Sequence, residues 1–225
     1  MMRGKIALVV GFCCGSSTLV AQAPGIPVVN AGVARGFTLG GALGFPNLAG
    51  EGGGTPVSVF GALGFRRVAV IGFGARVTGS PFGRYYAGGG NVVVKVAGGP
   101  LVPISINLQG GVGYSRRRLA GYSGPHEFIR VPLGLGISWT IPQPAVALKP
   151  WIAPRLEYNR LKTTTVVGVP GSQPETSTST DFGLSGGINF GILNGMGLDL
   201  SVDRLFTDIG RKPTTFAVGI SYTIK

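Results

Sequence analysis

The chain has 225 residues, of which 41 are glycine and only 12% are charged, and it carries a net charge of +12. Its mean hydropathy of +0.36 is high for a soluble protein, yet beyond position 25 no uninterrupted apolar run reaches the roughly 18 residues that a membrane-spanning helix needs. This argues against a helical membrane protein and indicates that the hydrophobicity is dispersed by alternation with other residues.

The N-terminal residues have the parts of a secretory signal peptide in the expected order. A basic start, MMRGK, precedes a 15-residue apolar stretch, IALVVGFCCGSSTLV, which ends before AQA, a pattern typical of a signal-peptidase site. We expect cleavage after Ala23, with Ala21 as the alternative because Pro24 hinders cutting before it; an uncleaved anchor helix is the other reading. This divides the chain into a signal peptide, residues 1–23, and one domain, residues 24–225. Both cysteines lie in the apolar stretch, so the mature chain has no disulfide.

The first alternating segment after the leader is FTLGGALGF, residues 37–45. Large apolar residues take every second position, and glycine, alanine and threonine take the positions between them. Period two is the pattern of a β-strand, but a soluble strand would place charged or long polar residues on its second face. The same pattern recurs and predicts ten strands. Their alternating positions span residues 33–45, 55–66, 68–78, 91–97, 102–115, 129–139, 146–158, 182–192, 198–202 and 216–224.

The connections between these segments alternate in length. RR, GGPL, TIPQPA and LNGM are short or moderate, whereas the connections between them are long, up to RLKTTTVVGVPGSQPETSTST. Short turns at one rim and long loops at the other predict an all-β fold, a transmembrane antiparallel up-and-down β-barrel of ten strands. Eight strands are the alternative, if the short segments 91–97 and 198–202 do not span the membrane.

The bulky side chains are expected to face lipid and the small ones the lumen, where tightly curved strands leave little room. For residues 68–78 this reading assigns Ala69, Ile71, Phe73, Ala75 and Val77 to the outside. Aromatic residues fall near both ends of the outward faces, as in interfacial girdles. The alternative is a water-soluble barrel or sandwich, which would expose mostly small residues with few charges.

The mature sequence resembles the small, porin-like outer-membrane β-barrel proteins of Gram-negative bacteria. Its last strand, TFAVGISYTIK, is similar to the C-terminal signal that such barrels present to the barrel-assembly machinery, although Ile224 and Lys225 replace the usual terminal aromatic residue. The resemblance implies location in the cell outer membrane, with outer-membrane lipid, lipopolysaccharide and the assembly machinery as partners. It specifies the architecture and leaves the activity open.

Charged residues at inward positions form the candidate lumen site. This charge cluster comprises Arg76, Lys95, Arg130, Arg155, Glu157, Asp181, Asp199 and Asp203. We expect the bases to gather on one arc of the barrel and the acids on the next. Two interpretations remain open: a transverse field across a narrow pore that selects small polar solutes, or internal salt bridges that close the lumen.

A second group of cations is expected in the long loops. The mature chain is basic, at +10 once Arg3 and Lys5 are removed, and the candidate anion contacts are Arg116, Arg117, Arg118, Arg160 and Lys162. They favour contact with lipopolysaccharide phosphates or an external polyanion; plain solvation of loop tips is the alternative. Nucleic-acid binding is not indicated, because no stacking platform accompanies the basic residues.

Catalysis is not indicated either. The single histidine, His126, is expected in a solvated loop beside Glu127, and no motif marks Ser115, Ser123 or Ser172 as a nucleophile. Metal-ligand spacing and nucleotide-binding motifs are absent from the sequence, so no metal or cofactor is expected. The sequence favours a non-enzymatic barrel that serves passive small-solute passage or envelope integrity. A surface-binding protein or adhesin that acts through basic loops is the alternative.

Overall fold

The computed structural model describes residues 26, 35–47, 54–80, 83–98, 102–118, 122–141, 143, 146–165, 173–207 and 213–224. The expected signal peptide, residues 1–23, and both cleavage positions lie outside the described residues.

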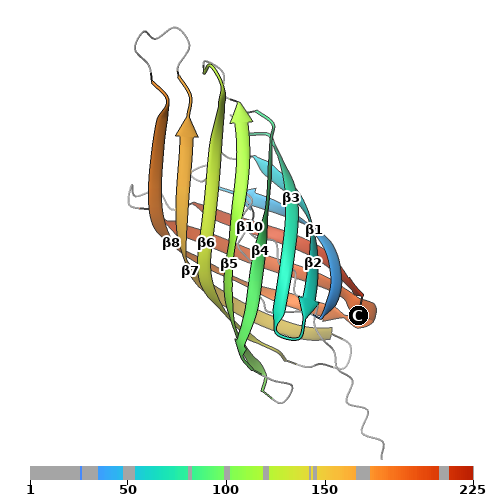
Figure 1. The fold of residues 1–225 in the computed structure, drawn as a ribbon. Helices are drawn as coiled ribbons and strands as arrows, with labels where there is room; N and C mark the ends of the chain where they lie inside the picture. The colour runs from blue at the N-terminus through green and yellow to red at the C-terminus, as the bar shows by residue number, and fades with distance from the viewer. Residues whose placement is uncertain are drawn as a thin grey trace, which may run out of the picture.

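Ten strands form one closed antiparallel barrel, in which each strand pairs with its sequence neighbours and β1 pairs with β10 (Figure 1). The strands are β1 Gly36–Pro46, β2 Thr55–Phe65, β3 Val68–Thr78, β4 Tyr85–Ala97, β5 Ile104–Arg118, β6 Pro125–Trp139, β7 Val146–Thr163, β8 Glu175–Ile192, β9 Met196–Phe206 and β10 Thr214–Ile224; a short 3-10 turn, Leu193–Gly195, joins β8 to β9. This confirms the ten-stranded up-and-down barrel over the eight-stranded alternative, because both segments in question are full strands. Closure leaves no strand edge unpaired within the barrel wall, as a hydrocarbon environment requires.

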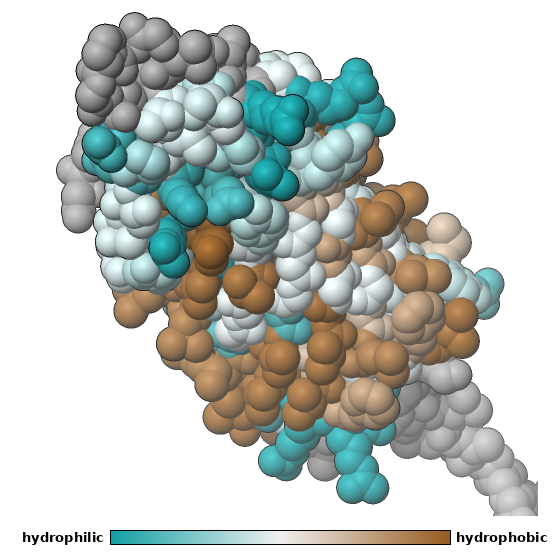
Figure 2. Space-filling model, turned by 45° about the horizontal axis from the view of Figure 1, so that its top comes forward, coloured by the Kyte–Doolittle hydropathy of each residue, from teal (hydrophilic) through white to brown (hydrophobic). Residues whose placement is uncertain are grey.

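Large apolar side chains cover the outside of the barrel. Phe45 is 50% exposed and Ile220 is 66% exposed, whereas the residues next to them in sequence, Gly44 and Ser221, are buried. In Figure 2 the apolar residues form a broad belt between hydrophilic ends. The inverted distribution matches a lipid-facing surface and excludes the soluble sandwich. Among the described residues, no helix is long and apolar enough to cross a membrane.

One strand faces the opposite way to the prediction. In β3 the residues Ala69, Ile71, Phe73, Ala75 and Val77 are buried in the lumen, and the alternate residues point outward. The cause is the two-residue turn before it: Phe65 pairs directly with Val68, and both are exposed. Paired residues share a face of the sheet, so the outward positions change from odd numbers in β2 to even numbers in β3.

Strands β4 to β8 reach further than the alternating pattern indicated. β4 begins at Tyr85, where the glycine run 88–90 suggested a loop, and β7 and β8 each contain 18 residues. Residues 175–180 of β8 are exposed on both faces, so no apolar alternation marks them, although the backbone still pairs with β7. Figure 1 shows β5 to β8 rising side by side at the upper left of the barrel.

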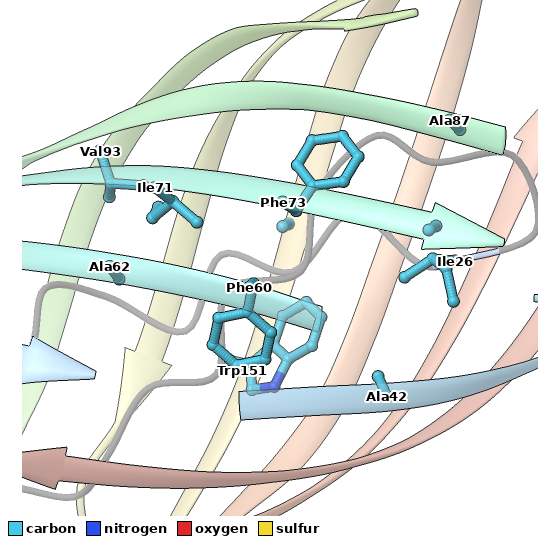
Figure 3. Packing of buried hydrophobic residues seen from close by; sticks show 11 residues of the cluster. Ile26, Ala42, Phe60, Ala62, Ile71, Phe73, Ala87, Val93 and Trp151 are labelled. Carbon is cyan, nitrogen blue, oxygen red and sulfur yellow. The ribbon is translucent and has the colours of Figure 1, made fainter. Parts of the chain in front are cut away.

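The part of the lumen beside β1 to β4 is filled by apolar side chains. Phe60, Phe73 and Ile71 lie there with Trp151 of β7, and Ile26 from the N-terminal segment is buried in the same cluster (Figure 3).

Each large ring in this cluster lies opposite a glycine of the adjacent strand. Phe60 pairs with Gly40, Phe73 with Gly89, and Trp151 with Gly187 of β8. A Cβ atom at Gly89 would lie 2.9 Å from Phe73 Cε1, and one at Gly187 would lie 3.0 Å from Trp151 Cζ2. At Gly40 the nearest atom would be Phe60 Cζ, whereas at Gly89 and Gly187 the carbonyl oxygens of Val112 and Leu200 lie closer than the rings. Glycine therefore belongs in these strands because the rings and the backbone of the adjacent strand occupy the space that a side chain would need.

Candidate functional site

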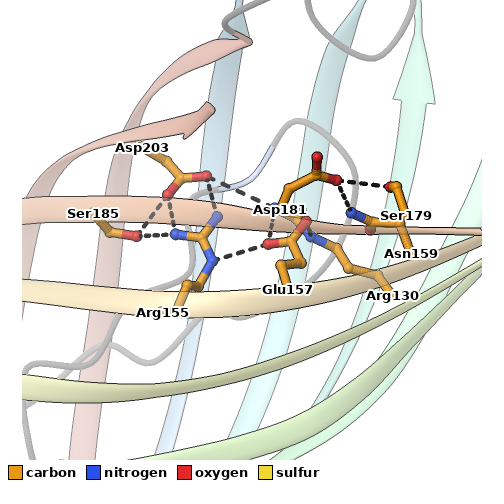
Figure 4. A network of polar contacts seen from close by, with 8 residues as sticks. All are labelled: Arg130, Arg155, Glu157, Asn159, Ser179, Asp181, Ser185 and Asp203. Atoms are coloured by element: carbon orange, nitrogen blue, oxygen red, sulfur yellow. Dashed lines mark hydrogen bonds and ion pairs between the residues drawn. The ribbon is translucent and has the colours of Figure 1, made fainter. Parts of the chain in front are cut away.

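The candidate site is a network of charged side chains across the lumen between β6 and β9 (Figure 4). Arg130 comes from β6, Arg155 and Glu157 from β7, and Asp203 from β9. All four are buried: Arg155 is 3% exposed and Glu157 is 0% exposed. They lie on inward positions because residues two apart in a strand share one face.

Arg155 is held by three partners on three strands. Its Nη1 and Nη2 donate to the two carboxylate oxygens of Asp203 at 2.6 and 2.9 Å, and its Nε donates to Glu157 Oε2 at 2.9 Å. Ser185 of β8 accepts a 2.8 Å hydrogen bond from Nη1 and itself donates to Asp203 Oδ1 at 2.6 Å. The planar guanidinium thus links β7, β8 and β9 with a fixed orientation.

Arg130 also binds the carboxylate of Glu157. Its Nε and Nη2 donate to Glu157 Oε1 and Oε2 at 2.6 and 2.8 Å, and Nη2 lies 3.8 Å from Asp203 Oδ2. Glu157 therefore bridges two guanidinium groups. The two bases and two acids have no net charge together, so none of the four is an uncompensated ion in the barrel interior.

Two glycines make room for the Arg155 side chain on the inner face of the barrel. Arg155 pairs with Gly134 of β6 on one side and Gly183 of β8 on the other. A Cβ atom at Gly183 would lie 2.6 Å from Arg155 Cζ, and one at Gly134 would lie 2.6 Å from Arg155 Cβ. The small residues on this part of the wall thus make room for a flat ion pair.

Smaller polar pairs extend the network along the lumen. Asp181 of β8 accepts hydrogen bonds from Asn159 Nδ2 at 3.0 Å and Ser179 Oγ at 2.7 Å. Asp199 of β9 accepts one from Asn189 Nδ2 at 3.2 Å. Each of these acids therefore has a neutral donor from its own or the adjacent strand.

The structure places most of the predicted lumen residues inside the barrel, with two differences. Arg76 is on the outward face of β3 and exposed, because the whole strand faces the other way; its assignment to the lumen was wrong. Lys95 lies at an inward position of β4 but is half-buried and outside the network. The expected separation of bases and acids into two arcs was also wrong, because Glu157 lies between Arg130 and Arg155.

Sequence reasoning missed the neutral members of the network. Ser185, Asn159 and Ser179 occupy inward positions in the alternating pattern, and that position was the available signal. Their partners depend on the register between strands, which the pattern of one strand does not contain.

The second predicted group lies on strands and not in loops. Arg116, Arg117 and Arg118 end β5, and Arg160 and Lys162 are near the end of β7. Arg117 takes an inward position and is half-buried, whereas the other four are exposed on the outward side. The loop assignment was wrong because the strands continue above the apolar belt, where both faces meet water and the period-two signal is lost.

His126 is also on a strand. It begins the inward face of β6 and is 3% exposed, with its ring edge-on to Tyr122 at 4.4 Å. Burial, and secondly the nearby Arg117 charge, lower the pKa of His126 below its ordinary value. The expectation of a solvated loop histidine was wrong.

None of the candidate nucleophiles is arranged with His126 in a described hydrogen bond. Ser115 is buried on β5, Ser123 is hydrogen-bonded to Thr165, and Ser172 lies outside the described residues. Across the described ranges, no group of three or more histidine, cysteine and acidic side chains could hold a metal ion.

No protein-family model matches this sequence, and no curated protein is significantly similar to it. Solved outer-membrane barrels are similar in fold. The N-terminal β-barrel domain of Pseudomonas aeruginosa OprF is 11% identical, with a TM-score of 0.37 over 84% of this chain and 98% of that one. Ail of Yersinia pestis, solved with the heparin analogue sucrose octasulfate, is 13% identical, with a TM-score of 0.38 over 85% and 100%. The outer membrane protease OmpT from Escherichia coli is 11% identical, with a TM-score of 0.47 over 84% and 94%.

The closed wall, the apolar outer belt and the hydrophilic ends together define how the chain is placed in a cell. A barrel of this kind is stable where lipid covers its outside. The chain has the architecture of a small outer-membrane β-barrel protein, and its location is the outer membrane.

Proposed function

We propose that this protein is a closed, non-enzymatic barrel that supports the integrity of the outer membrane. The observation that carries the proposal is the filling of the lumen from both sides: ion pairs beside β6 to β9 and aromatic rings beside β1 to β4. This packing favours the plug interpretation over the selective pore.

The ion pairs support the same proposal through their geometry. A transverse field that selects solutes needs charges that face an open path, with water around them. Here Glu157 uses both carboxylate oxygens on two guanidinium groups, and Arg155 uses all three of its guanidinium nitrogens. Groups that are so fully engaged act on each other and are not available to a passing solute.

Deletion of the gene tests this proposal in the source bacterium. We expect the deletion strain to become sensitive to bile salts and large hydrophobic antibiotics, while its uptake of small polar solutes stays unchanged. Wild-type protein should restore resistance. A loss of small-solute uptake with unchanged detergent resistance would instead assign the protein to passive passage.

A second candidate function, surface binding, is favoured by the extended strands. Arg116 and Arg118 on β5 and Arg160 and Lys162 on β7 are exposed on the outward side beyond the belt, with Glu127 of β6 as the acid between them. Such a surface attracts polyanions. Proteoliposomes with the wild-type protein should bind dextran sulfate in a salt-dependent way, and a variant with all four bases changed to glutamine should not; equal binding by both would remove this candidate.

A further inference from the structure

A groove of about 590 Å³ lies on the outer surface of β2, β3 and β4. Its walls are Val57 and Val59 of β2 and Tyr86 of β4, and Gly74 and Arg76 of β3 line it between them. No heavy atom lies within 4 Å of the position that a Cβ atom would take at Gly74. The groove therefore has a backbone floor, aliphatic and aromatic walls, and one cationic side chain.

The register of the strands places Arg76 at the level of the lipid headgroups. Arg76 pairs with Val57, which pairs with Leu43, and in the other direction Arg76 pairs with Tyr86, which pairs with Arg116. Because strands tilt in an outer-membrane barrel, such a cross-strand row climbs through the membrane. The row is aliphatic up to Val57 and charged or aromatic from Arg76 onward, so Arg76 is its first cation at the edge of the apolar belt.

The barrel provides no acidic partner for Arg76 on the strands around it. The acidic residues that the structure describes all lie on β6 to β9. A guanidinium at the edge of the hydrocarbon region is stabilised by an anion, and here that anion must come from outside the described chain. Arg116 lies two strands away, about 10 Å by the usual strand spacing, so two cations flank Tyr86.

We propose that this groove binds a phosphorylated glycolipid of the outer leaflet, of the lipopolysaccharide type. One phosphate contacts the Arg76 guanidinium beside the Tyr86 hydroxyl, a second faces Arg116, and an acyl chain lies over Gly74 between Val59 and Tyr86. The two separated cations match a lipid with two phosphates better than one with a single phosphodiester, because guanidinium groups bind phosphate oxygens in pairs. The site goes beyond the proposed function, because it assigns the barrel a specific annular lipid.

Native mass spectrometry of the folded protein in detergent tests the proposal, with bisphosphorylated lipid A and phosphatidylglycerol as separate probes. Arg76→Gln removes the cation, and Gly74→Leu fills the groove. The matched controls are Arg204→Gln, an exposed arginine on β9 that lies over the Phe206 ring, and Gly110→Leu, on the outward side of β5. Heat-dependent migration in gels identifies the folded variants.

We expect both groove variants to bind lipid A about tenfold more weakly, Arg76→Gln through the loss of one charge-assisted contact and Gly74→Leu because its side chain takes the place of the acyl chain. Both controls should bind lipid A like the wild type. Lipid A binding that is unchanged in Arg76→Gln would overturn the site, and this variant decides alone if Gly74→Leu does not fold. Phosphatidylglycerol that binds as tightly as lipid A, with the same loss in Arg76→Gln, would overturn the assignment to a bisphosphorylated lipid.

Discussion

Beside β6 to β9 the lumen is crossed by ion pairs, whereas beside β1 to β4 it is filled by aromatic and aliphatic side chains. Glycine is present on the inward face in both parts, but for different reasons. Gly40 leaves space for the ring of Phe60, and Gly183 leaves space for the guanidinium of Arg155. The comparison shows that a glycine on the inward face can make room for either an apolar ring or a charged side chain. The paired residue on the adjacent strand decides which of the two fills the lumen.

The largest effect is expected from removing the shared acid of the polar part. Glu157→Ala leaves Arg130 and Arg155 with one carboxylate, Asp203, in a buried site. Breaking such a network costs about 3–5 kcal/mol because an uncompensated charge remains. Urea unfolding of the protein in lipid vesicles measures the free energy of unfolding.

The matched control is Glu175→Ala, at the exposed start of β8, which should change that free energy by less than about 0.5 kcal/mol. Equal effects of the two substitutions would mean that the buried pairs do not stabilise the barrel.

The apolar part should respond to added volume. Gly40→Ala places a methyl group 2.6 Å from Phe60 Cε1 and closer still to Phe60 Cζ, and overpacking of this kind costs about 1–3 kcal/mol. Gly72→Ala on β3, where no atom lies within 4 Å, is the control and should be nearly neutral.

The double variant Gly40→Ala with Phe60→Leu sharpens this prediction. If the ring causes the clash, Gly40→Ala should cost less in the Phe60→Leu background than in the wild type. Strictly additive effects would show that the pairing of ring and glycine is coincidental.

The same test in the polar part is expected to give a smaller effect. Gly183→Ala pushes the Arg155 guanidinium away from Asp203, but an arginine side chain adapts more easily than a ring. We expect a loss of about 1 kcal/mol in the free energy of unfolding. The loss should vanish in an Arg155→Met background; if it persists there, the backbone and not the ion pair is affected.

The smallest effect concerns pH at the top of β6. Burial lowers the pKa of His126 in the folded protein, so the neutral form is favoured there. The stability from this preference is present above the unfolded pKa of about 6.5 and is lost as pH falls below it, because the unfolded state then binds the proton more readily. The drop in unfolding free energy between pH 7.5 and 5.5 should be smaller in His126→Gln; an identical drop would assign the pH dependence to other groups.

The sequence was sufficient to predict the wall of the barrel. Lipid imposes an apolar residue at every second position, and this pattern shows in each strand of the apolar belt without knowledge of its neighbours. The face of β3 was wrong because both of its faces are apolar or small, so the two-residue turn at Arg66 and Arg67, and not the side chains, determines its orientation.

The site was predictable only in part, for a related reason. Alternation identified Arg130, Arg155, Glu157 and Asp203 as inward residues, and they are. Which acid binds which base depends on register, since a shift along the strand changes every cross-strand partner.

Planar-bilayer recording of the refolded wild-type protein tests the closed lumen most directly. The packing of ion pairs against aromatic rings predicts a silent bilayer under conditions where Glu157→Ala with Phe73→Ala, which removes one filling group from each part, gives discrete current steps. Stable, ion-selective steps from the wild-type protein would contradict the closed lumen and support the interpretation as a selective pore.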